Sequence, residues 1–279
     1  MKYKYMCNGL AGIILFISCY MSTASAGLIV TQNNSATDLV TNILGGGIVT
    51  SGQTTIGASD AFGTFTGGIS AGIGIESGIM LSSGNVADAV GPNTETSTTT
   101  NFGTAGDASL TALSGNSTFD AAFLNFDFIS DGGDLFFSYI FASEEYNEFV
   151  NQSVNDVFGF FLDGSNIALV PGTSTPVSID TVNLGSNSGF FNDNEGATFD
   201  IEYDGFTDVF TASFIGLSAG SHNIKMGVAD GGDNVYDSTV FIQAGSFSDI
   251  DTTSVPEPST LAIFALGIVG LTSRRFKKQ

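Results

Sequence analysis

The sequence predicts an all-β protein: an antiparallel, jelly-roll-like β-sandwich with one or two short helices, an N-terminal signal peptide and a single-span C-terminal helix. Three observations predict this fold class. Apolar residues occur in short runs, several of which alternate with polar residues as half-buried strands do. Gly, Asn, Asp and Ser cluster between the runs as turns. Because successive strands have no helices between them, the sheets should be antiparallel and packed face to face.

Five runs illustrate the predicted strands. Leu124–Phe128, Phe206–Phe214 and Ile224–Val228 alternate apolar with polar or small residues, which is typical of strands with one buried face. Leu135–Phe141 and Val157–Leu162 are more continuously apolar and are expected in the centre of the sheets.

Two short helices and one long loop complete the expected body. Asp38–Leu44 is preceded by Ser35 and Thr37 as possible caps and is closed by Gly45, and Ala108–Leu113 ends near Gly115. Gly91–Gly106 has little apolar content and is expected to be a long exposed loop.

The N-terminus has the features of a secretory signal peptide. Lys2 and Lys4 precede the apolar run Leu10–Cys19, and small residues follow it. Cleavage is expected before Gly27, at the site formed by Ala24, Ala26 and Gly27. An alternative interpretation makes Cys19 a lipidated N-terminus. Both cysteines lie within this segment, so the mature chain has no thiol for a disulfide or for catalysis.

Charge excludes several classes of partner. Of the 28 acidic residues, 27 lie between Gly27 and Asp251, where Lys225 is the only basic residue and His222 the only histidine. Nucleic acid and anionic membrane surfaces are therefore not expected partners. The many Phe, Ile, Val and Leu residues nevertheless allow a large folded core.

The C-terminus combines a Pro-Glu-Pro motif, the short apolar run Leu261–Leu271 and a basic end. The run is about half the length of an ordinary membrane helix, and the basic end is expected to act as a stop-transfer cluster on the cytoplasmic side. The motif residues are Val255, Pro256, Glu257, Pro258, Ser259 and Thr260. The stop-transfer residues are Arg274, Arg275, Lys277 and Lys278.

These three parts resemble the PEP-CTERM sorting signal of Gram-negative bacteria. The resemblance implies a temporary anchor in the inner membrane, which an exosortase recognises and cuts near Pro256–Pro258 before the body is exported to the cell surface or released. The alternative is a permanent single-span anchor. The expected organisation is a signal peptide at 1–26, a body at 27–247, a linker at 248–254 and a sorting signal at 255–279.

Segments in the middle of the chain are similar, in order and spacing, to the choice-of-anchor L domain. They are Phe141–Tyr146 (FASEEY), Asn155–Phe161 (NDVFGFF), Ile167–Pro176 (IALVPGTSTP) and Asp230–Phe241 (DGGDNVYDSTVF). The resemblance covers roughly Thr37–Phe247 and implies an extracellular domain joined to a sorting signal. It implies no activity that can be transferred to particular residues.

Acidic residues gather where predicted strands begin or end, and the body offers them almost no basic side chain. A divalent cation is therefore the expected counter-charge, and calcium (Ca²⁺) suits carboxylate, amide and carbonyl oxygens in irregular geometry. The alternative is that these acids are solvated and keep the protein soluble. The candidate metal ligands are Glu144, Glu145, Asp156, Asp230, Asp233 and Asp237.

The sequence also contains patterns typical of two enzyme classes, serine hydrolases and glycosidases. Ser70 and Ser218 each lie in a Gly-x-Ser-x-Gly pattern, which is typical of the nucleophile of a serine hydrolase, but a Gly/Ser-rich chain produces such matches by chance. His222 would have to be the base of such an enzyme, and it is expected to face solvent. Asp200–Asp204 would place three acids on one face of a strand, as a glycosidase could use them, although simple alternation on a solvent face explains the pattern equally well.

The sequence therefore favours a secreted, non-enzymatic surface or extracellular-matrix protein with a structural or adhesive role. Its expected partners are an exosortase, the inner membrane during sorting, and an exopolysaccharide or a second copy of the chain. By resemblance to proteins with this tail, the setting is a biofilm or floc matrix. The alternative is a carbohydrate-active enzyme or a lectin-like glycan-binding module.

Overall fold

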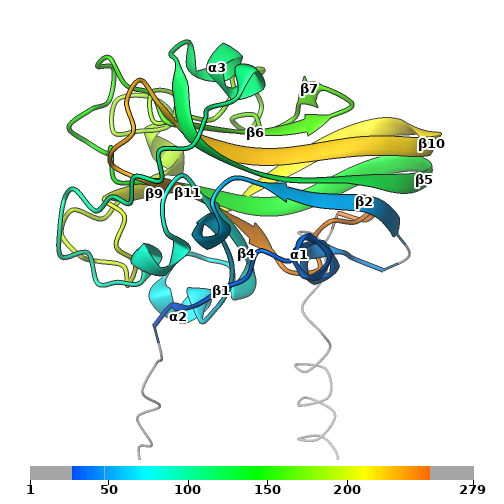
Figure 1. The fold of residues 1–279 in the computed structure, drawn as a ribbon, viewed down its shortest axis with the longest axis horizontal. Helices are drawn as coiled ribbons and strands as arrows, with labels where there is room; N and C mark the ends of the chain where they lie inside the picture. The colour runs from blue at the N-terminus through cyan, green and yellow to red at the C-terminus, as the bar shows by residue number, and fades with distance from the viewer. Residues whose placement is uncertain (1–26, 47, 252–279) are drawn as a thin grey trace, which may run out of the picture.

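The computed structural model describes residues 27–46 and 48–251, which form a mostly antiparallel β-sheet with few short helices (Figure 1). The predicted signal peptide, the sorting motif and the stop-transfer residues lie outside the described residues. Within the described ranges, no helix is both long enough and apolar enough to span a membrane.

The described strands and helices are short, apart from two strands. The strands are β1 (Ile29–Gln32), β2 (Val49–Ile56), β3 (Phe62–Thr66), β4 (Ser77–Ser82), β5 (Thr118–Ser143), β6 (Val157–Leu162), β7 (Ser165–Asn166), β8 (Phe191–Asp193), β9 (Gly205–Thr207), β10 (Phe210–Gly231) and β11 (Ser238–Gln243). The helices are α1 (Ala36–Ile43), α2 (Gly68–Ala71) and α3 (Ala108–Ser114), with 3₁₀ turns at Ser59–Ala61, Val86–Ala89 and Ser188–Phe190.

All strand pairs are antiparallel and belong to one hydrogen-bonded sheet. Its main order is β1-β3-β4-β11-β5-β10-β6-β7; β2 and β9 also pair with β5, and β8 pairs with β9. The jelly-roll-like sandwich stays a prediction, because the described strands form one continuous sheet rather than two separate ones.

The longest strands, β5 and β10, form a ribbon that bends near its middle. Phe210 of β10 lies opposite Tyr139 of β5, and the pairing continues to Gly231 opposite Thr118 (Figure 1). The bend occurs at Gly132 and Gly133, whose φ angles of 93° and 121° suit glycine.

The bend brings the two halves of β5 into contact through aromatic side chains. The ring of Phe247, which follows β11, lies 5.3 Å from that of Phe126 and 5.2 Å from that of Phe128, both in the first half. It also lies 5.7 Å from the ring of Phe137 in the second half. These rings belong to the main hydrophobic core. We refer to the two halves of the ribbon with their neighbouring strands as its two layers.

The structure confirms the two predicted helices and the strand Val157–Leu162, and it changes the bounds of the other predicted strands. Helix α1 begins at the predicted cap Ser35, and α3 ends at Gly115 with a φ of 79°. The runs Leu124–Phe128 and Leu135–Phe141, expected as separate strands, are parts of β5. The Gly, Asp and Ser residues between these runs predict a turn, but the ribbon continues through them.

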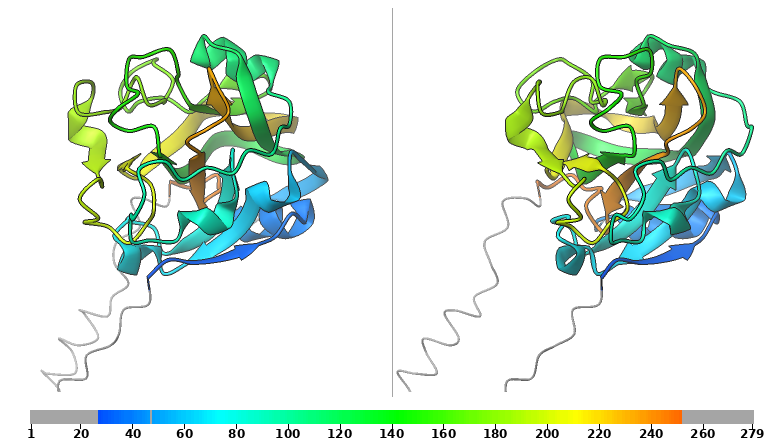
Figure 2. Two further views of the ribbon diagram at one scale, coloured as in Figure 1. Left: turned by 60° about the vertical axis from the view of Figure 1, so that its left-hand side comes forward. Right: turned by 90° about the vertical axis from the view of Figure 1, so that its left-hand side faces the viewer.

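Several loops gather at the end of the ribbon away from its bend. They include the segment after β5, the β10–β11 connection and the Gly91–Gly106 loop, and Figure 2 turns this end toward the viewer. Both ends of β5 lie here, because the ribbon folds back on itself. Acidic residues from both layers therefore meet at this end.

Candidate cation-binding centre

Three neighbouring strands place an acidic residue at the same level of the sheet. The last residue of β5 pairs with the first residues of both β11 and β9. Glu144, which follows β5, therefore lies beside Asp237 and Asp204, which precede β11 and β9. The Glu144 N–H donates to the Asp237 carbonyl at 3.1 Å. We call these three residues the Glu144 group. Their like charges lie side by side, which is unfavourable without a counter-charge.

The three carboxylates differ in how well their oxygens are satisfied. Asp237 accepts a hydrogen bond of 2.7 Å from the Thr100 N–H, and Asp204 accepts one of 2.7 Å from the Asn93 amide. The second oxygen of Asp204 and both oxygens of Glu144 have no hydrogen-bond partner. Because Glu144 is only 1% exposed, water cannot readily satisfy it.

A second group of carboxylates lies at the adjoining end of the other layer. Ala229 pairs with Val157 between β10 and β6, so Asp230 lies beside Asp156. Asp156 accepts hydrogen bonds from the Gly231 N–H at 2.9 Å and from the Ser238 hydroxyl at 2.6 Å. Asp230 is 1% exposed, and neither of its oxygens has a partner.

Glu145 and Asp233 lie beside this second group. Glu145 is buried next to Asp156, and one of its carboxylate oxygens has no partner. Asp233 is half-buried and accepts a hydrogen bond of 3.2 Å from the Val235 N–H. We call Asp156, Asp230 and Glu145 the Asp230 group, with Asp233 at its edge.

The Gly91–Gly106 loop closes over the Glu144 group and the neighbouring carboxylates of Glu202 and Asp120. It is irregular, as expected, but its threonine hydroxyls and main-chain N–H groups also point inward, to Asp237, Glu202 and Asp120. Asp120 accepts a hydrogen bond of 3.0 Å from the Thr104 hydroxyl. The loop therefore depends on the carboxylates beneath it for its own hydrogen bonds.

Burial makes these carboxyl groups hard to ionise. It raises the pKa of Glu144 to about 10, with further increases from the charges of Asp204, Glu202 and Asp237. Burial likewise raises the pKa of Asp156 to about 8 and places that of Asp230 well above its usual range. The same cause raises the pKa of Glu145 to about 11 and those of Asp204 and Asp237 to about 7. Glu144, Glu145 and Asp156 therefore stay mostly protonated near neutral pH unless a cation neutralises them, whereas Asp204 and Asp237 are partly ionised there.

The basic side chains of the described residues are engaged elsewhere. Lys225 donates to Asp107 at 2.7 Å and lies 4.0 Å from the centre of the Phe123 ring. The only other described ion pair joins His222 to Asp163. Eight described carboxylates are nine-tenths buried or more, and none of them is paired with either base: Asp120, Glu144, Glu145, Asp156, Glu202, Asp204, Asp230 and Asp237.

The structure brings the six predicted ligands to one end of the ribbon, but in two groups rather than one. Asp237 joins Glu144, whereas Glu145, Asp156, Asp230 and Asp233 belong to the other group. Asp204 was missed as a ligand candidate, although its position just before a short apolar strand is the same signal that singled out the others. As they stand, no three acidic or histidine side chains of the described residues form a ready metal site. Calcium stays a prediction.

The predicted acidic strand at Asp200–Asp204 is wrong in its local structure. The segment contains one isolated bridge at Ile201 and bends, and β9 begins only at Gly205. Glu202 is 6% exposed and accepts hydrogen bonds from the Glu95 main-chain N–H and from the Thr98 hydroxyl, both at 3.1 Å. The alternation of acids reflects burial under the loop rather than one solvent face.

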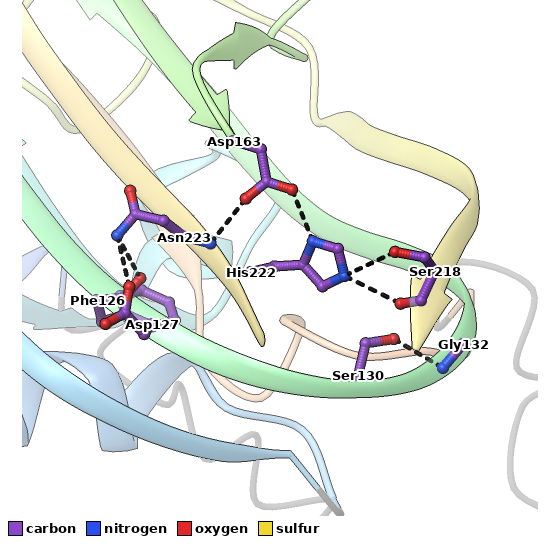
Figure 3. Close-up of polar contacts among 8 residues, drawn as sticks. All are labelled: Phe126, Asp127, Ser130, Gly132, Asp163, Ser218, His222 and Asn223. Carbon is purple, nitrogen blue, oxygen red and sulfur yellow. Dashed lines mark hydrogen bonds and ion pairs between the residues drawn. The ribbon is translucent and has the colours of Figure 1, made fainter. Parts of the chain in front are cut away.

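The expectation that His222 faces solvent is also wrong. His222 is 9% exposed and packs against Phe128. Residues two apart on a strand share a face, so His222 lies on the same side as the buried Ile224. Figure 3 shows its ring between Asp163 and Ser218, where Nδ1 lies 2.6 Å from the Asp163 carboxylate and Nε2 lies 2.9 Å from the Ser218 carbonyl.

The hydrogen bonds of His222 favour an imidazolium ion rather than a general base. Both ring nitrogens face acceptors, and the bond to Asp163 raises the pKa of His222. The Ser218 hydroxyl lies 3.4 Å from Nε2, farther than the carbonyl of the same residue. A nitrogen that donates to this carbonyl has no lone pair with which to accept the hydroxyl proton.

We expect His222→Gln to destabilise the protein more at about pH 5.5 than at about pH 9. Because the folded pKa is raised, the contribution of His222 is fully present below its unfolded pKa and is lost as the pH rises through the folded value. Urea unfolding of both proteins at each pH measures the difference. Ser218→Ala keeps the carbonyl and should leave the pH dependence unchanged; its disappearance in that variant would contradict the assignment.

Two family models match the chain. One, described as the Choice-of-anchor L domain, matches residues 28–248, and the other, the PEP-CTERM protein-sorting motif, matches residues 254–278. No curated protein and no solved structure matches the sequence. Both resemblances noted from the sequence are thereby confirmed. The sorting motif implies export, processing by an exosortase and sorting to the cell surface.

Proposed function

Because the chain belongs to the choice-of-anchor L family and carries a PEP-CTERM sorting motif, we propose that it is a non-enzymatic, calcium-dependent structural or adhesive protein of the cell surface or extracellular matrix. The observation that carries the calcium dependence is Glu144. Its carboxylate is buried, has no hydrogen-bond partner and lies beside Asp204 and Asp237.

The chemistry of this centre favours calcium over other cations. Its side chains offer carboxylate and hydroxyl oxygens, which calcium accepts in irregular arrangements and in larger number than magnesium. Zinc and copper prefer imidazole and thiolate ligands. The single histidine of the chain contacts Asp163 instead, and both cysteines lie in the predicted signal peptide.

Calcium also offers a link to the matrix. An acidic protein and an acidic exopolysaccharide repel each other, whereas a divalent cation can be shared by carboxylates of both or by two copies of the chain. Buried ions would stabilise the fold, and ions at exposed acidic side chains would join it to its surroundings. This role requires no catalytic residue.

Calcium is expected to raise the melting temperature of the protein. A ligand that binds only the folded state at about a hundred times its Kd adds roughly 2.7 kcal/mol. For a body of this size, that corresponds to about 5 to 10 °C. The measurement compares the melting temperatures in calcium, magnesium and chelator at one ionic strength. Glu144→Gln removes the buried carboxylate, and Glu148→Gln, which changes an exposed one, is its control.

The proposal fails if calcium and chelator give the same melting temperature. The carbohydrate-active alternative would gain support from a glycan that the wild type hydrolyses and Glu202→Gln does not. The hydrogen bonds that Glu202 accepts from the loop support a structural role for this residue. The adhesive role is tested by calcium-dependent co-sedimentation with an acidic polysaccharide such as alginate.

A further inference from the structure

The acidic end of the ribbon contains two separate carboxylates that lack partners. Glu144 follows the end of β5, and Asp230 follows Ala229, the last residue of β10 that pairs with β6. Each is 1% exposed, and neither oxygen of either residue has a hydrogen-bond partner. The Thr98 main chain lies near Glu144 and the Ser83 side chain near Asp230, but neither makes a hydrogen bond of normal geometry to the carboxylate.

Different neighbours surround the two unpartnered residues. Asp204 and Glu202 act electrostatically on Glu144, whereas Asp156 and Asp120 act on Asp230. The two sets come from different layers of the folded ribbon. One divalent ion offsets two negative charges, but each unpartnered residue and its neighbours together carry more than two ionisable carboxyl groups.

Asp237 is the residue common to both sets. It ends the connection from β10 to β11, which passes from one layer to the other. The next residue, Ser238, pairs with the end of β5 and donates to Asp156 at 2.6 Å. Asp237 is therefore placed between the two groups.

Gly84 holds this position open. A Cβ atom at Gly84 would lie 1.6 Å from the Asp237 carboxylate oxygen and 2.1 Å from its carbon. Any other residue at position 84 would displace the carboxylate. The glycine lets Asp237 pack against the main chain at this point.

We propose that the acidic end of the ribbon holds two divalent cations, one at Glu144 and one at Asp230, with Asp237 as a ligand shared by both. This inference rests on the proposed calcium function and specifies its site. Bound in this way, the cations join the ends of the two layers and the Gly91–Gly106 loop that covers them. Binding of the first ion orders Asp237 for the second, so the sites are expected to be cooperative.

Equilibrium dialysis of the full chain in a non-ionic detergent, with calcium measured by mass spectrometry, tests the proposal. The wild type should bind two tight calcium ions per chain. Glu144→Gln and Asp230→Asn should each retain one, and the double variant none. Glu148→Gln, which changes an exposed acid close to Glu144 in sequence, should retain two.

Two further variants test the shared ligand. Asp237→Asn should weaken both sites by at least about tenfold, since even the loss of a residue that only supports a metal ligand typically costs that much. Gly84→Ala should also weaken both sites, because its Cβ displaces the Asp237 carboxylate, although it removes no carboxylate from the chain. Near-ultraviolet circular dichroism identifies variants that have not folded.

The outcomes separate this inference from the proposed function. One tight calcium ion in the wild type, or loss of only one ion from Asp237→Asn, overturns the shared two-ion centre but leaves the calcium function standing. No tight calcium in the wild type overturns both.

Discussion

Without calcium, the protein is expected to become less stable as the pH rises from about 5 to about 9. Burial raises the pKa of Glu144 to about 10, and that of Asp237 to about 7. Over this range the folded chain keeps protons that the unfolded chain has released. Because the folded state binds more protons, the free energy of unfolding decreases with rising pH.

Calcium should reverse this trend. A ligating carboxylate must be ionised, so calcium competes with protons and binds more tightly as the pH rises. The difference in unfolding free energy between calcium and chelator should therefore be small near pH 5 and large near pH 9. Since one pKa unit corresponds to about 1.4 kcal/mol, the loss in chelator is on the order of several kcal/mol.

Urea unfolding at a series of pH values, with calcium and with chelator, measures both curves. In chelator, Glu144→Gln should lose less stability with rising pH than the wild type, because its amide does not ionise. Glu148→Gln should follow the wild type. A chelated wild type that is as stable at about pH 9 as at about pH 5 would show that the buried carboxylates ionise without cost.

The sequence was informative where a local rule applies. Ser35 and Gly115 limit helices because capping depends on neighbouring residues alone. The acids that flank strand ends could be recognised from the alternation around them. Their burial could not, because it depends on the Gly91–Gly106 loop, which closes over them from elsewhere in the chain.

Long-range pairing explains what the sequence left open. The glycines at 132 and 133 look like a turn, but pairing with β10 carries β5 through them. The position of Asp204 beside Glu144 depends on the pairing of β9 with the end of β5, more than sixty residues earlier in the chain. The error at His222 has a different cause. The alternation along the strand places His222 on the same buried face as Ile224, so the sequence alone was enough to predict its burial.

Phe247→Ala is expected to destabilise the protein by about 3 to 5 kcal/mol, which is typical for removing a buried phenylalanine. Phe247 is fully buried, and its ring contacts rings from both halves of β5. Its loss leaves a cavity between the layers that the main chain cannot easily close. Urea unfolding in calcium measures the change, and Phe214→Ala, at a side chain that is 36% exposed, is the matched control.

The same variant tests whether packing positions the cation ligands. Glu144 and Asp230 come from different layers, so a change between the layers should lower calcium affinity although Phe247 is itself no ligand. Phe214→Ala should leave both stability and calcium affinity close to wild type. If Phe247→Ala destabilised the fold but bound calcium as tightly as the wild type, the acidic end would be held by its own loops. Packing between the two layers would then not position the cation ligands.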